Sequence, residues 1–311
     1  MDAIMVTRFG GPEVLEPVTL PTPEPAEGQL RVAVEYAGVG WLDTLLRKGN
    51  GPAEFPVRPP YVPGGAVAGT VTGPGVAAEW LGARVVTRAP SGGYADTVLA
   101  DAGFAFRVPD RLGLREALAV LDDGSTAVAL LEKTPVSDGD EVLVVPGVGG
   151  LGSLLVQLAR DAGAAVIAAV RGPEKLALAR DLGVRAVDYA APDWAGRLPG
   201  LDVVFDGVGG PLGSAALARL RDGGRFSGYG MSSGAPTALT DADRRRLTVA
   251  DMSQLPEFWP DTPRRIRHVL AETAAGRLKP VVTRIYPLRE AAAAHEDFEQ
   301  RRVTGKLLLR P

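Results

Sequence analysis

The stretch that decides the fold is EVLVVPGVGGLGSLLVQLARDAG, residues 141–163. The apolar, β-branched run at 142–145 is typical of a buried strand, and the proline and glycines after it mark a turn. From residue 150 apolar residues recur with the period of a helix, while Gln157, Arg160 and Asp161 fall on the opposite face. The stretch therefore predicts a strand, a tight turn and a helix in direct succession.

The glycine spacing in that turn points to a dinucleotide. Gly147, Gly149 and Gly152 fit the G-x-G-x-x-G pattern, in which glycines permit the turn, admit a pyrophosphate and seat the helix on the strand. The start of the helix adds N–H donors and a partial positive charge. The residues predicted to hold the phosphates are Gly147, Gly149, Gly150, Leu151 and Gly152.

Length and composition describe an ordinary globular protein. The chain has 311 residues, of which 46% are hydrophobic and 23% charged, with a formal net charge of −3. It is long enough for two domains, and it has no basic stripe for nucleic acid. Proline and glycines break its longest apolar run, which argues against a membrane span. The N-terminus lacks the features of a signal peptide, so we expect a cytoplasmic protein that acts on a small molecule.

The residue types present also limit the chemistry. The sequence has no cysteine, which excludes disulfides, thiolate nucleophiles and any zinc site built on cysteine. Only His268 and His295 remain as soft metal ligands. They are far apart in sequence on predicted helices, and we interpret both as structural. A metal site is therefore not expected.

Residues 1–120 have the pattern of a β-rich domain. Apolar and polar residues alternate at 29–36, as in a half-buried strand, and further short strands are predicted at 67–72, 84–87 and 94–99. Between them, residues 41–47 are compatible with a helical turn. A loop rich in glycine and proline follows at 49–65, and loops of this kind often carry function.

Residues 121–258 alternate strands and helices after predicted helices at 113–121 and 125–133. The strand-like runs are 142–145, 166–170, 185–188, 202–206 and 224–228. The helical patterns are 150–162, 173–182, a shorter one near 193–198, and 211–221. This alternation predicts an α/β fold with a doubly wound parallel sheet of the Rossmann type. Ligands of such sheets bind beyond the carboxyl ends of the strands.

Residues 259–311 form the last predicted segment. Helices are expected at 262–275 and 288–300, and strands at 281–286 and 306–309. These strands come too late in the chain to extend the parallel sheet. We therefore expect the segment to fold back onto the first domain.

The residue after the second strand of the parallel sheet indicates which dinucleotide is bound. An acidic residue there would hold the ribose hydroxyls of NAD, but this chain has Arg171, which suits the 2′-phosphate of NADP. Lys175 lies in the first turn of the next helix, where a cation is disfavoured unless an anion is near. Tyr189, after the third strand, could offer a hydroxyl. Glu174 in the same turn weakens the argument slightly, and solvated surface roles for these residues stay open.

Two further loops lie on the same carboxyl edge, at 206–209 and 228–234. Their glycines let the main chain approach the nicotinamide half of a dinucleotide, although plain turns at strand ends have the same composition. The residues assigned to this part of the cofactor site are Val208, Gly209, Gly230 and Ser232.

The chain resembles the medium-chain dehydrogenase/reductases, and within them the zinc-independent quinone oxidoreductase branch. The resemblance covers nearly the whole chain and lies in segments that follow in the family's order. These segments are AGVGWLDTLLRKG (37–49), VPGGAVAG (62–69), GGYADTV (92–98), PGVGGLGSLLVQLARDAGA (146–164), EKLALARDLG (174–183), DVVFDGVGG (202–210) and TGKLLLRP (304–311).

The resemblance implies a Rossmann-type domain inserted into a GroES-like catalytic domain formed by both chain ends. It also implies NADPH, a cleft between the domains, and commonly a homodimer. In this branch a Lys, a Tyr and a C-terminal Arg that match Lys175, Tyr189 and Arg301 hold the 2′-phosphate. The chain departs from the family at Gly40, where an Asn that contacts the nicotinamide side is usual, and at Ala66 and Ala83, where acidic residues are common.

The chemistry that follows is hydride transfer from NADPH to a quinone or an α,β-unsaturated carbonyl, whose conjugation spreads the developing negative charge without a metal. The candidate catalytic residues are Gly40, Asp43 and Tyr61, with solvent as another proton donor. Tyr36 is more readily explained as an inward-facing strand residue. Asp43 could equally cap the short helix at 41–47.

Three functions remain open from the sequence. The first is an NADPH-dependent quinone or enone reductase. The second is an NADP-binding protein without reductase activity, which the missing Asn at position 40 would support. The third is a specialised biosynthetic enoyl reductase, or an enzyme on this fold repurposed for one metabolite.

Overall fold

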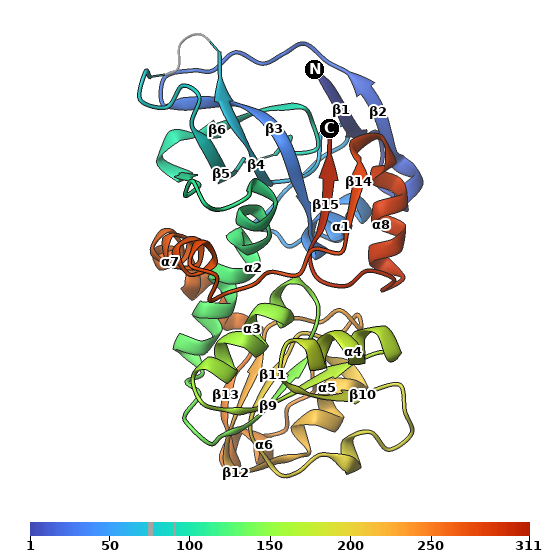
Figure 1. The fold of residues 1–311 in the computed structure, drawn as a ribbon. Helices are drawn as coiled ribbons and strands as arrows, with labels where there is room; N and C mark the ends of the chain where they lie inside the picture. Colours follow the sequence, from blue (N-terminus) through green and yellow to red (C-terminus); the bar gives the residue numbers. More distant parts are fainter. Residues whose placement is uncertain (74–76, 90) are drawn as a thin grey trace. The chain divides into compact units, whose positions relative to one another are not determined.

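The computed structural model describes residues 1–73, 77–89 and 91–311 (Figure 1). These residues divide into two compact units. The terminal unit comprises Met1–Asp122 and Ile266–Pro311, and the central unit comprises Asp123–Arg265. The chain thus leaves the terminal unit once and returns to it.

The central unit is built on a six-stranded, fully parallel sheet in the order β10-β9-β8-β11-β12-β13. Its strands are β8 (Glu141–Val145), β9 (Ala165–Val170), β10 (Arg185–Asp188), β11 (Leu201–Asp206), β12 (Leu220–Gly228) and β13 (Thr248–Ala250). Numbered along the chain, this is the order 3-2-1-4-5-6 of dinucleotide-binding folds. The predicted Rossmann-type, doubly wound α/β class is confirmed. The strand order reverses between β8 and β11, where such sheets bind ligands.

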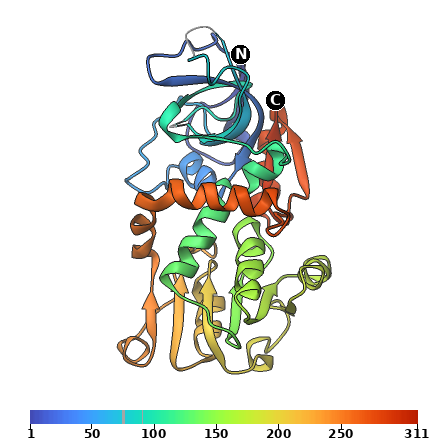
Figure 2. The same ribbon diagram turned by 60° about the vertical axis from the view of Figure 1, so that its left-hand side comes forward.

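Helices connect the strands of this sheet, and Figure 2 shows several of the strands side by side. The helical elements are α3 (Gly150–Asp161), α4 (Pro173–Asp181), η3 (Ala195–Arg197), α5 (Gly210–Leu217), α6 (Asp241–Arg246) and η4 (Met252–Asp261). The middle strands are covered on both faces, since Val142, Val144, Val203 and Val204 are fully buried. Continuous apolar strands of this kind are expected in a parallel sheet with helices on both sides.

Three predictions about the elements around this sheet were wrong. The helices predicted at 113–121 and 125–133 form one helix, α2 (Leu114–Lys133), which runs through Gly124 and Ser125. The helix predicted to reach residue 221 ends at Leu217, and β12 begins at Leu220. The sixth strand, β13, was not predicted because three residues are too few to show a period.

The terminal unit is β-rich, as predicted. Its main sheet has the order β14-β15-β3-β4-β5-β7, with β6 also paired to β3, and β1 pairs separately with β2. The strands are β1 (Asp2–Val6), β2 (Leu15–Thr19), β3 (Gln29–Val39), β4 (Ala66–Thr72), β5 (Arg84–Arg88), β6 (Thr97–Asp101), β7 (Ala105–Arg107), β14 (Arg284–Pro287) and β15 (Leu307–Arg310). The GroES-like class expected for this part of the chain is confirmed.

Helices of the terminal unit cover this sheet and bring the C-terminal segment against it. They are η1 (Pro12–Val14), α1 (Trp41–Lys48), η2 (Ala102–Phe104), η5 (Leu288–Glu290) and α8 (Ala291–Glu299), while α7 (Thr262–Ala274) spans the boundary. Strand β15 pairs antiparallel with β3, with Leu308 opposite Gly38. The strand predicted at 281–286 begins three residues later, at Arg284. The last strands therefore add to the β-rich sheet and not to the parallel one.

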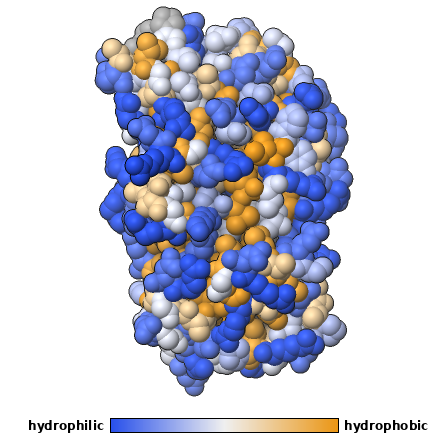
Figure 3. All heavy atoms as spheres, in the orientation of Figure 1, coloured by the Kyte–Doolittle hydropathy of each residue, from blue (hydrophilic) through white to orange (hydrophobic). Residues whose placement is uncertain are grey.

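Apolar side chains are mostly buried, and the face in Figure 3 mixes hydrophilic and hydrophobic patches. Large apolar side chains that are exposed in the described chain include Phe9, Phe55, Leu81, Trp259 and Ile285. Among the described helices none combines the length and apolar composition that crossing a bilayer would need.

Candidate active site

The predicted phosphate-binding turn lies between β8 and α3. The Gly147 N–H donates to the Ala169 carbonyl at 2.9 Å, which ties the turn to the neighbouring strand. A Cβ atom built on Gly147 would lie 2.4 Å from the Ala168 Cβ, and one on Gly152 would lie 1.9 Å from the Pro146 carbonyl oxygen. Both positions require glycine because strand and helix approach so closely there.

Gly149 differs from these two glycines. A Cβ at this position would meet only the Pro146 ring at 3.9 Å, an ordinary contact, so packing within the chain does not demand a glycine. Gly149 is also the N-cap of α3 and brings no side chain to the N–H groups of the first turn. Gly150 and Leu151, the first residues of that turn, are half-buried. The space beside Gly149 is therefore a cradle that a side chain would fill, of the kind that admits a pyrophosphate.

The two cations predicted to select NADP both follow β9, and the predicted tyrosine follows the adjacent strand β10. Arg171 directly follows β9 and is exposed, while Lys175 is half-buried in the first turn of α4. The Tyr189 N–H donates to the Val170 carbonyl at 2.9 Å, which holds Tyr189 beside the end of β9. The structure thus brings Arg171, Lys175 and Tyr189 to one corner of the carboxyl edge.

An acidic residue does lie at this corner, but the backbone engages it. The Asp188 Oδ2 atom accepts from the Gly172 N–H at 3.3 Å, and Oδ1 accepts from the Ala190 N–H at 2.9 Å. The Arg171 side chain makes no hydrogen bond or ion pair within the described parts of the chain. The arrangement suits a phosphate at Arg171 better than a pair of ribose hydroxyls.

The loop after β11 is held by Asp206, a residue the sequence analysis did not single out. Its Oδ1 atom accepts from the N–H groups of Val208 and Gly209, each at 2.9 Å, and Oδ2 accepts from the Thr237 hydroxyl at 2.5 Å. Burial raises the pKa of this carboxyl. Gly209 has φ +71°, and a Cβ there would lie 2.1 Å from the Ala235 carbonyl oxygen. This glycine is thus required by the loop's own packing.

The loop after β12 packs on the first one. A Cβ on Gly230 would lie 2.7 Å from the Gly207 carbonyl oxygen, which also accepts from the Ser232 N–H at 3.3 Å. The Tyr229 hydroxyl is buried and lacks a hydrogen-bond partner within the described chain, and burial raises its pKa. Tyr229 was missed because a tyrosine after a strand carries no distinctive spacing. Its hydroxyl is therefore an unsatisfied buried polar group at this edge of the sheet.

In the terminal unit, Gly40 and Asp43 form the start of α1. The Gly40 N–H donates to the Asp43 Oδ2 atom at 2.8 Å, so Asp43 caps the helix, an alternative that the sequence left open. A Cβ built on Gly40 would meet only that oxygen, at 3.4 Å, so the backbone has room for a side chain here. Burial is the main reason that the pKa of Asp43 rises to about 6.

Tyr61 belongs to the same surroundings. Its hydroxyl is buried and has no hydrogen-bond partner among the described residues. Burial and the nearby Asp43 charge raise its pKa to about 12, while Arg47 opposes this effect. An unpartnered hydroxyl near a carboxyl of raised pKa is suited to proton donation.

The raised pKa of Asp43 predicts a pH-dependent stability. The carboxyl has an ordinary pKa of 3.8 when unfolded and about 6 when folded, so its ionised form destabilises the fold. The free energy of unfolding therefore falls as the pH rises from 3.8 to about 6. Above about pH 6 the decrease amounts to roughly 3 kcal/mol. Asp43→Asn keeps an oxygen for the Gly40 N–H, so urea denaturation should show the variant to be more stable than the parent at pH 8. At pH 4 the two proteins should be nearly equal, and an equal difference at both pH values would contradict this.

A buried chain of polar side chains near Asp43 was not foreseen. The Arg47 guanidinium contacts His295 Nδ1 at 3.2 Å through Nη1, the Gly10 carbonyl at 3.2 Å through Nε, and Glu299 at 2.5 Å through Nη2. The Tyr94 hydroxyl and His295 Nε2 are 2.9 Å apart. The interpretation of His295 as a helix residue fits its place in α8, but its contacts with Arg47 and Tyr94 join three separate segments of the terminal unit.

Arg301, the third residue that the family resemblance assigns to the 2′-phosphate, belongs to the terminal unit. It follows α8 in the terminal unit with φ +58°, and its N–H donates to the Phe298 carbonyl at 3.0 Å. Lys175 and Tyr189 belong to the central unit. The role of Arg301 at the 2′-phosphate therefore stays a prediction from the family resemblance.

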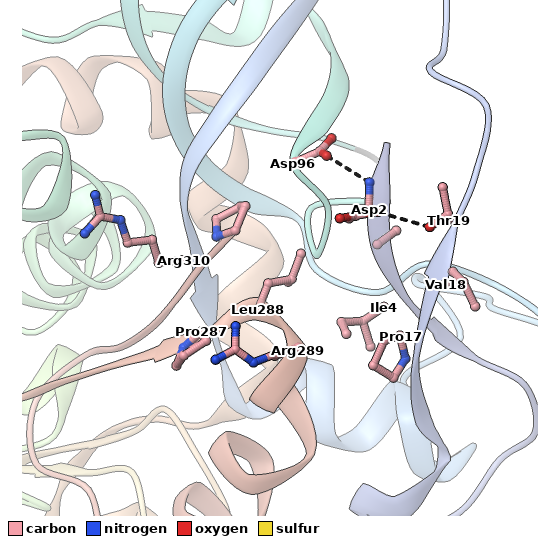
Figure 4. A pocket seen from close by; sticks show the side chains of 12 residues that line it. Asp2, Ile4, Pro17, Val18, Thr19, Asp96, Pro287, Leu288, Arg289 and Arg310 are labelled. Carbon is pink, nitrogen blue, oxygen red and sulfur yellow. Dashed lines mark hydrogen bonds between the residues drawn. The ribbon is translucent and has the colours of Figure 1, made fainter.

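A cavity of about 500 Å³ lies in the terminal unit (Figure 4). It is lined by strands β1 and β2 and by the C-terminal residues, and Figure 4 shows Asp2 bonded to Asp96 on one side and to Thr19 on the other. None of the predicted site residues lines it. Across the described chain, no three His, Asp or Glu side chains are grouped so that they could hold a metal ion.

Comparison with known proteins agrees with the fold. Residues 26–110 match the alcohol dehydrogenase GroES-like domain, and residues 182–309 match the family described as zinc-binding dehydrogenase. The chain is 32% identical to a probable quinone oxidoreductase of Schizosaccharomyces pombe, covering 98% of this chain and 96% of that protein. It is also 32% identical to a 2-haloacrylate reductase of a Burkholderia species, over 99% of this chain and 98% of the relative.

A solved structure is similar over its whole length. The Escherichia coli quinone oxidoreductase complexed with NADPH has a TM-score of 0.90 and 29% sequence identity, with both chains fully covered. The fold, the glycine turn and these matches place the chain in the medium-chain dehydrogenase/reductase superfamily. Within that superfamily it belongs to the quinone oxidoreductase branch, as the sequence segments indicated.

Proposed function

We propose that the protein is an NADPH-dependent reductase that transfers hydride to a quinone or to the β-carbon of an α,β-unsaturated carbonyl, without a metal. The observation that carries this proposal is the cradle at Gly149, where the chain's own packing does not require glycine. It lies at the carboxyl end of β8, next to the reversal in strand order. The similarity to a reductase solved with NADPH supports the same cofactor.

The central unit would hold the cofactor along its carboxyl edge. We propose that N–H groups at the start of α3 bind the pyrophosphate, with Gly147 and Gly152 shaping the turn. Arg171, Lys175 and Tyr189 would hold the 2′-phosphate. The two loops locked together by Asp206 and Gly230 would present Val208, Gly209 and Ser232 to the nicotinamide half; NADPH, when bound, supplies the hydride.

The terminal unit would supply the proton. Asp43 has a pKa of about 6, so near neutral pH part of the population carries a proton that can be donated to the reduced acceptor. Tyr61 would donate a hydrogen bond to the acceptor's oxygen, which stabilises the negative charge that develops there. Gly40 holds Asp43 in place through its N–H group.

The proposal is tested by following NADPH oxidation at 340 nm with 1,4-benzoquinone, 9,10-phenanthrenequinone and a small enone. Turnover of at least one acceptor is expected. Binding of NADPH without turnover of any of them would instead favour a nucleotide-binding protein without reductase activity. We also propose a homodimer, as the family resemblance implies, which light scattering during gel filtration would test.

A metabolite-specific reductase is the second candidate. It is favoured by the similarity to a 2-haloacrylate reductase, whose name specifies an activated alkene as its substrate. Fast reduction of a halogenated or other conjugated acid, together with slow reduction of quinones, would support this alternative.

Replacing Arg171 tests the choice of cofactor. Arg171→Ala removes an exposed cation that makes no hydrogen bond or ion pair within the described chain, so little stability should be lost. A hydrogen bond to a charged group contributes about 1.5–3 kcal/mol, and we therefore expect NADPH to bind about 10 to 100 times more weakly. Calorimetric titration with NADPH and NADH would measure this.

The affinity for NADH is the internal control of that titration. NADH lacks the 2′-phosphate, so Arg171→Ala should leave its affinity unchanged. Arg245→Ala, which removes an exposed arginine from α6, is the matched control and should leave both affinities unaltered. Equal weakening of NADPH and NADH would remove Arg171 from its assigned role.

A further inference from the structure

The loop that follows α1 contains a pair of residues that the proposed function does not use. Asn50 and Gly51 begin the part of the chain rich in glycine and proline, and Asn50 is the only asparagine in the sequence. Asn50 is exposed, Gly51 is half-buried, and neither belongs to a helix or a strand. The pair places a side-chain amide directly before a residue that has no side chain to shield its own nitrogen.

The main chain is fixed just before this pair. The Gly49 N–H donates to the Leu46 carbonyl at 3.0 Å, and the Asn50 N–H donates to the Leu45 carbonyl at 2.9 Å. Gly49 has φ +77°, so these two bonds form a Schellman cap that closes α1. The N–H group of Gly51 comes after this cap, where no helical hydrogen bond engages it.

The two groups that would have to react are both without hydrogen bonds. Within the described chain, neither the side-chain amide of Asn50 nor the N–H group of Gly51 has a hydrogen-bond partner. An asparagine side chain reaches the main-chain nitrogen of the next residue through a five-membered ring. Glycine at that next position leaves the nitrogen open to approach, because a Cβ atom would otherwise crowd it.

We propose that Asn50 is a site of spontaneous covalent modification, at which the Gly51 nitrogen attacks the side-chain carbonyl carbon. The bond between that nitrogen and Asn50 Cγ forms, and the bond from Cγ to the amide nitrogen breaks. The proton given up by Gly51 leaves with the amide nitrogen as ammonia, and a cyclic imide remains. Water then opens the imide at either carbonyl, which yields aspartate or isoaspartate at position 50.

The other amide side chains of the protein lack this combination. None of the four glutamines is followed by glycine, and closure of a glutamine ring needs one more atom. All four also make hydrogen bonds that hold the amide in place, two of them in the interior. These glutamines are Gln29, Gln157, Gln254 and Gln300.

The modification falls in a segment whose two ends are anchored. The Schellman cap holds one end, and Tyr61 holds the other, since the Tyr61 N–H donates to the Val6 carbonyl at 3.2 Å and the Val6 N–H donates to the Tyr61 carbonyl at 2.8 Å. Isoaspartate adds one methylene group to the main chain, which the loop at 51–60 must absorb. We therefore expect the folded protein to accumulate the modified form, whose net charge is one unit more negative than −3.

The test is incubation of the folded protein at neutral and at slightly alkaline pH, followed by anion exchange and peptide mass spectrometry. We expect a more acidic form to appear, with the amide of residue 50 replaced by an acid. Its rate of formation should rise with pH, because the attacking nitrogen must lose its proton. Fragmentation by electron transfer distinguishes isoaspartate from aspartate in the same peptide.

Two variants identify the reacting pair. Asn50→Gln should abolish the acidic form, and Gly51→Ala, which keeps the amide but shields the nitrogen, should slow its formation at least about tenfold. The new methyl group of Gly51→Ala would meet the end of the flexible Leu46 side chain, so thermal unfolding confirms that this variant is folded. Gln29→Glu, which removes another exposed amide, is the matched control and should convert at the parent's rate.

The proposal would be overturned if the parent protein kept its amide throughout the incubation, or if the acid arose at a glutamine. Conversion of Gly51→Ala at the parent's rate would equally overturn it, because the shielded nitrogen could not then be the attacking group. None of these measurements uses NADPH or an acceptor. Absence of NADPH oxidation would thus contradict the proposed function alone.

Discussion

Gly152→Ala is expected to lower the unfolding temperature by roughly 10 °C, whereas Gly149→Ala should leave it within a few degrees of the parent. A Cβ at position 152 would lie 1.9 Å from the Pro146 carbonyl oxygen, so α3 would have to move away from the end of β8. Overpacking against main chain costs about 3 kcal/mol, and in a protein of this size each kcal/mol changes the unfolding temperature by about 2–4 °C.

Gly149→Ala should instead affect ligand binding. Its Cβ would meet only the Pro146 ring at 3.9 Å, and alanine at this N-cap position costs below about 1 kcal/mol. The methyl group would occupy the space proposed for the pyrophosphate, so we expect NADPH to bind at least about tenfold more weakly. Calorimetric titration and thermal unfolding of both variants measure the two effects.

The contrast between the two variants is itself the control, because they add the same methyl group three residues apart. If Gly149→Ala bound NADPH as tightly as the parent, the cradle would not be the pyrophosphate site. If Gly152→Ala were as stable as the parent, the close approach of α3 and β8 would not be the reason for that glycine.

The sequence predicted those features of the fold that depend on a local period. Strands β8 and β11 are continuous apolar runs, and α3 and α4 show helical spacing, so each was found within a residue or two. Strand β13 has three residues and no period of its own; it exists because β12 offers it a pairing edge. Helix α2 was divided in the prediction because Asp123 and Ser125 resemble an N-cap, yet the surrounding chain keeps the helix continuous.

The prediction of the site was limited in the same way, to residues whose roles follow from local sequence. The glycine turn and Arg171 could be found because their roles depend on distance along the chain from a strand end. Arg47 and His295 are 248 residues apart in sequence, and no local pattern joins them. The reason for Gly209 was also hidden, because it depends on a carbonyl of a loop that follows another strand. Contacts of this kind arise only when the strands are placed side by side.

Asp43→Asn is expected to reduce kcat for an enone by about 10²-fold, with NADPH affinity unchanged. The carboxyl is the proposed proton donor, and general acid catalysis contributes about 10²–10⁴-fold. In the parent the Gly40 N–H donates to the Asp43 Oδ2 atom at 2.8 Å, and asparagine keeps an oxygen that can accept this hydrogen bond, so α1 should stay capped. Steady-state kinetics of NADPH oxidation, with the cofactor affinity measured by titration, would separate catalysis from binding.

The pH profile adds a second criterion to this prediction. In the parent, burial raises the pKa of Asp43 to about 6, so kcat should fall as pH rises through that value and the carboxyl loses its proton. In Asp43→Asn this decrease of kcat with pH should disappear. Asp101→Asn is the matched control, because the Asp101 carboxylate also accepts a backbone N–H, from Gly103 at 2.8 Å, in the same unit. If Asp43→Asn kept the parent's kcat and also the decrease of kcat near pH 6, solvent or Tyr61 would be the proton donor.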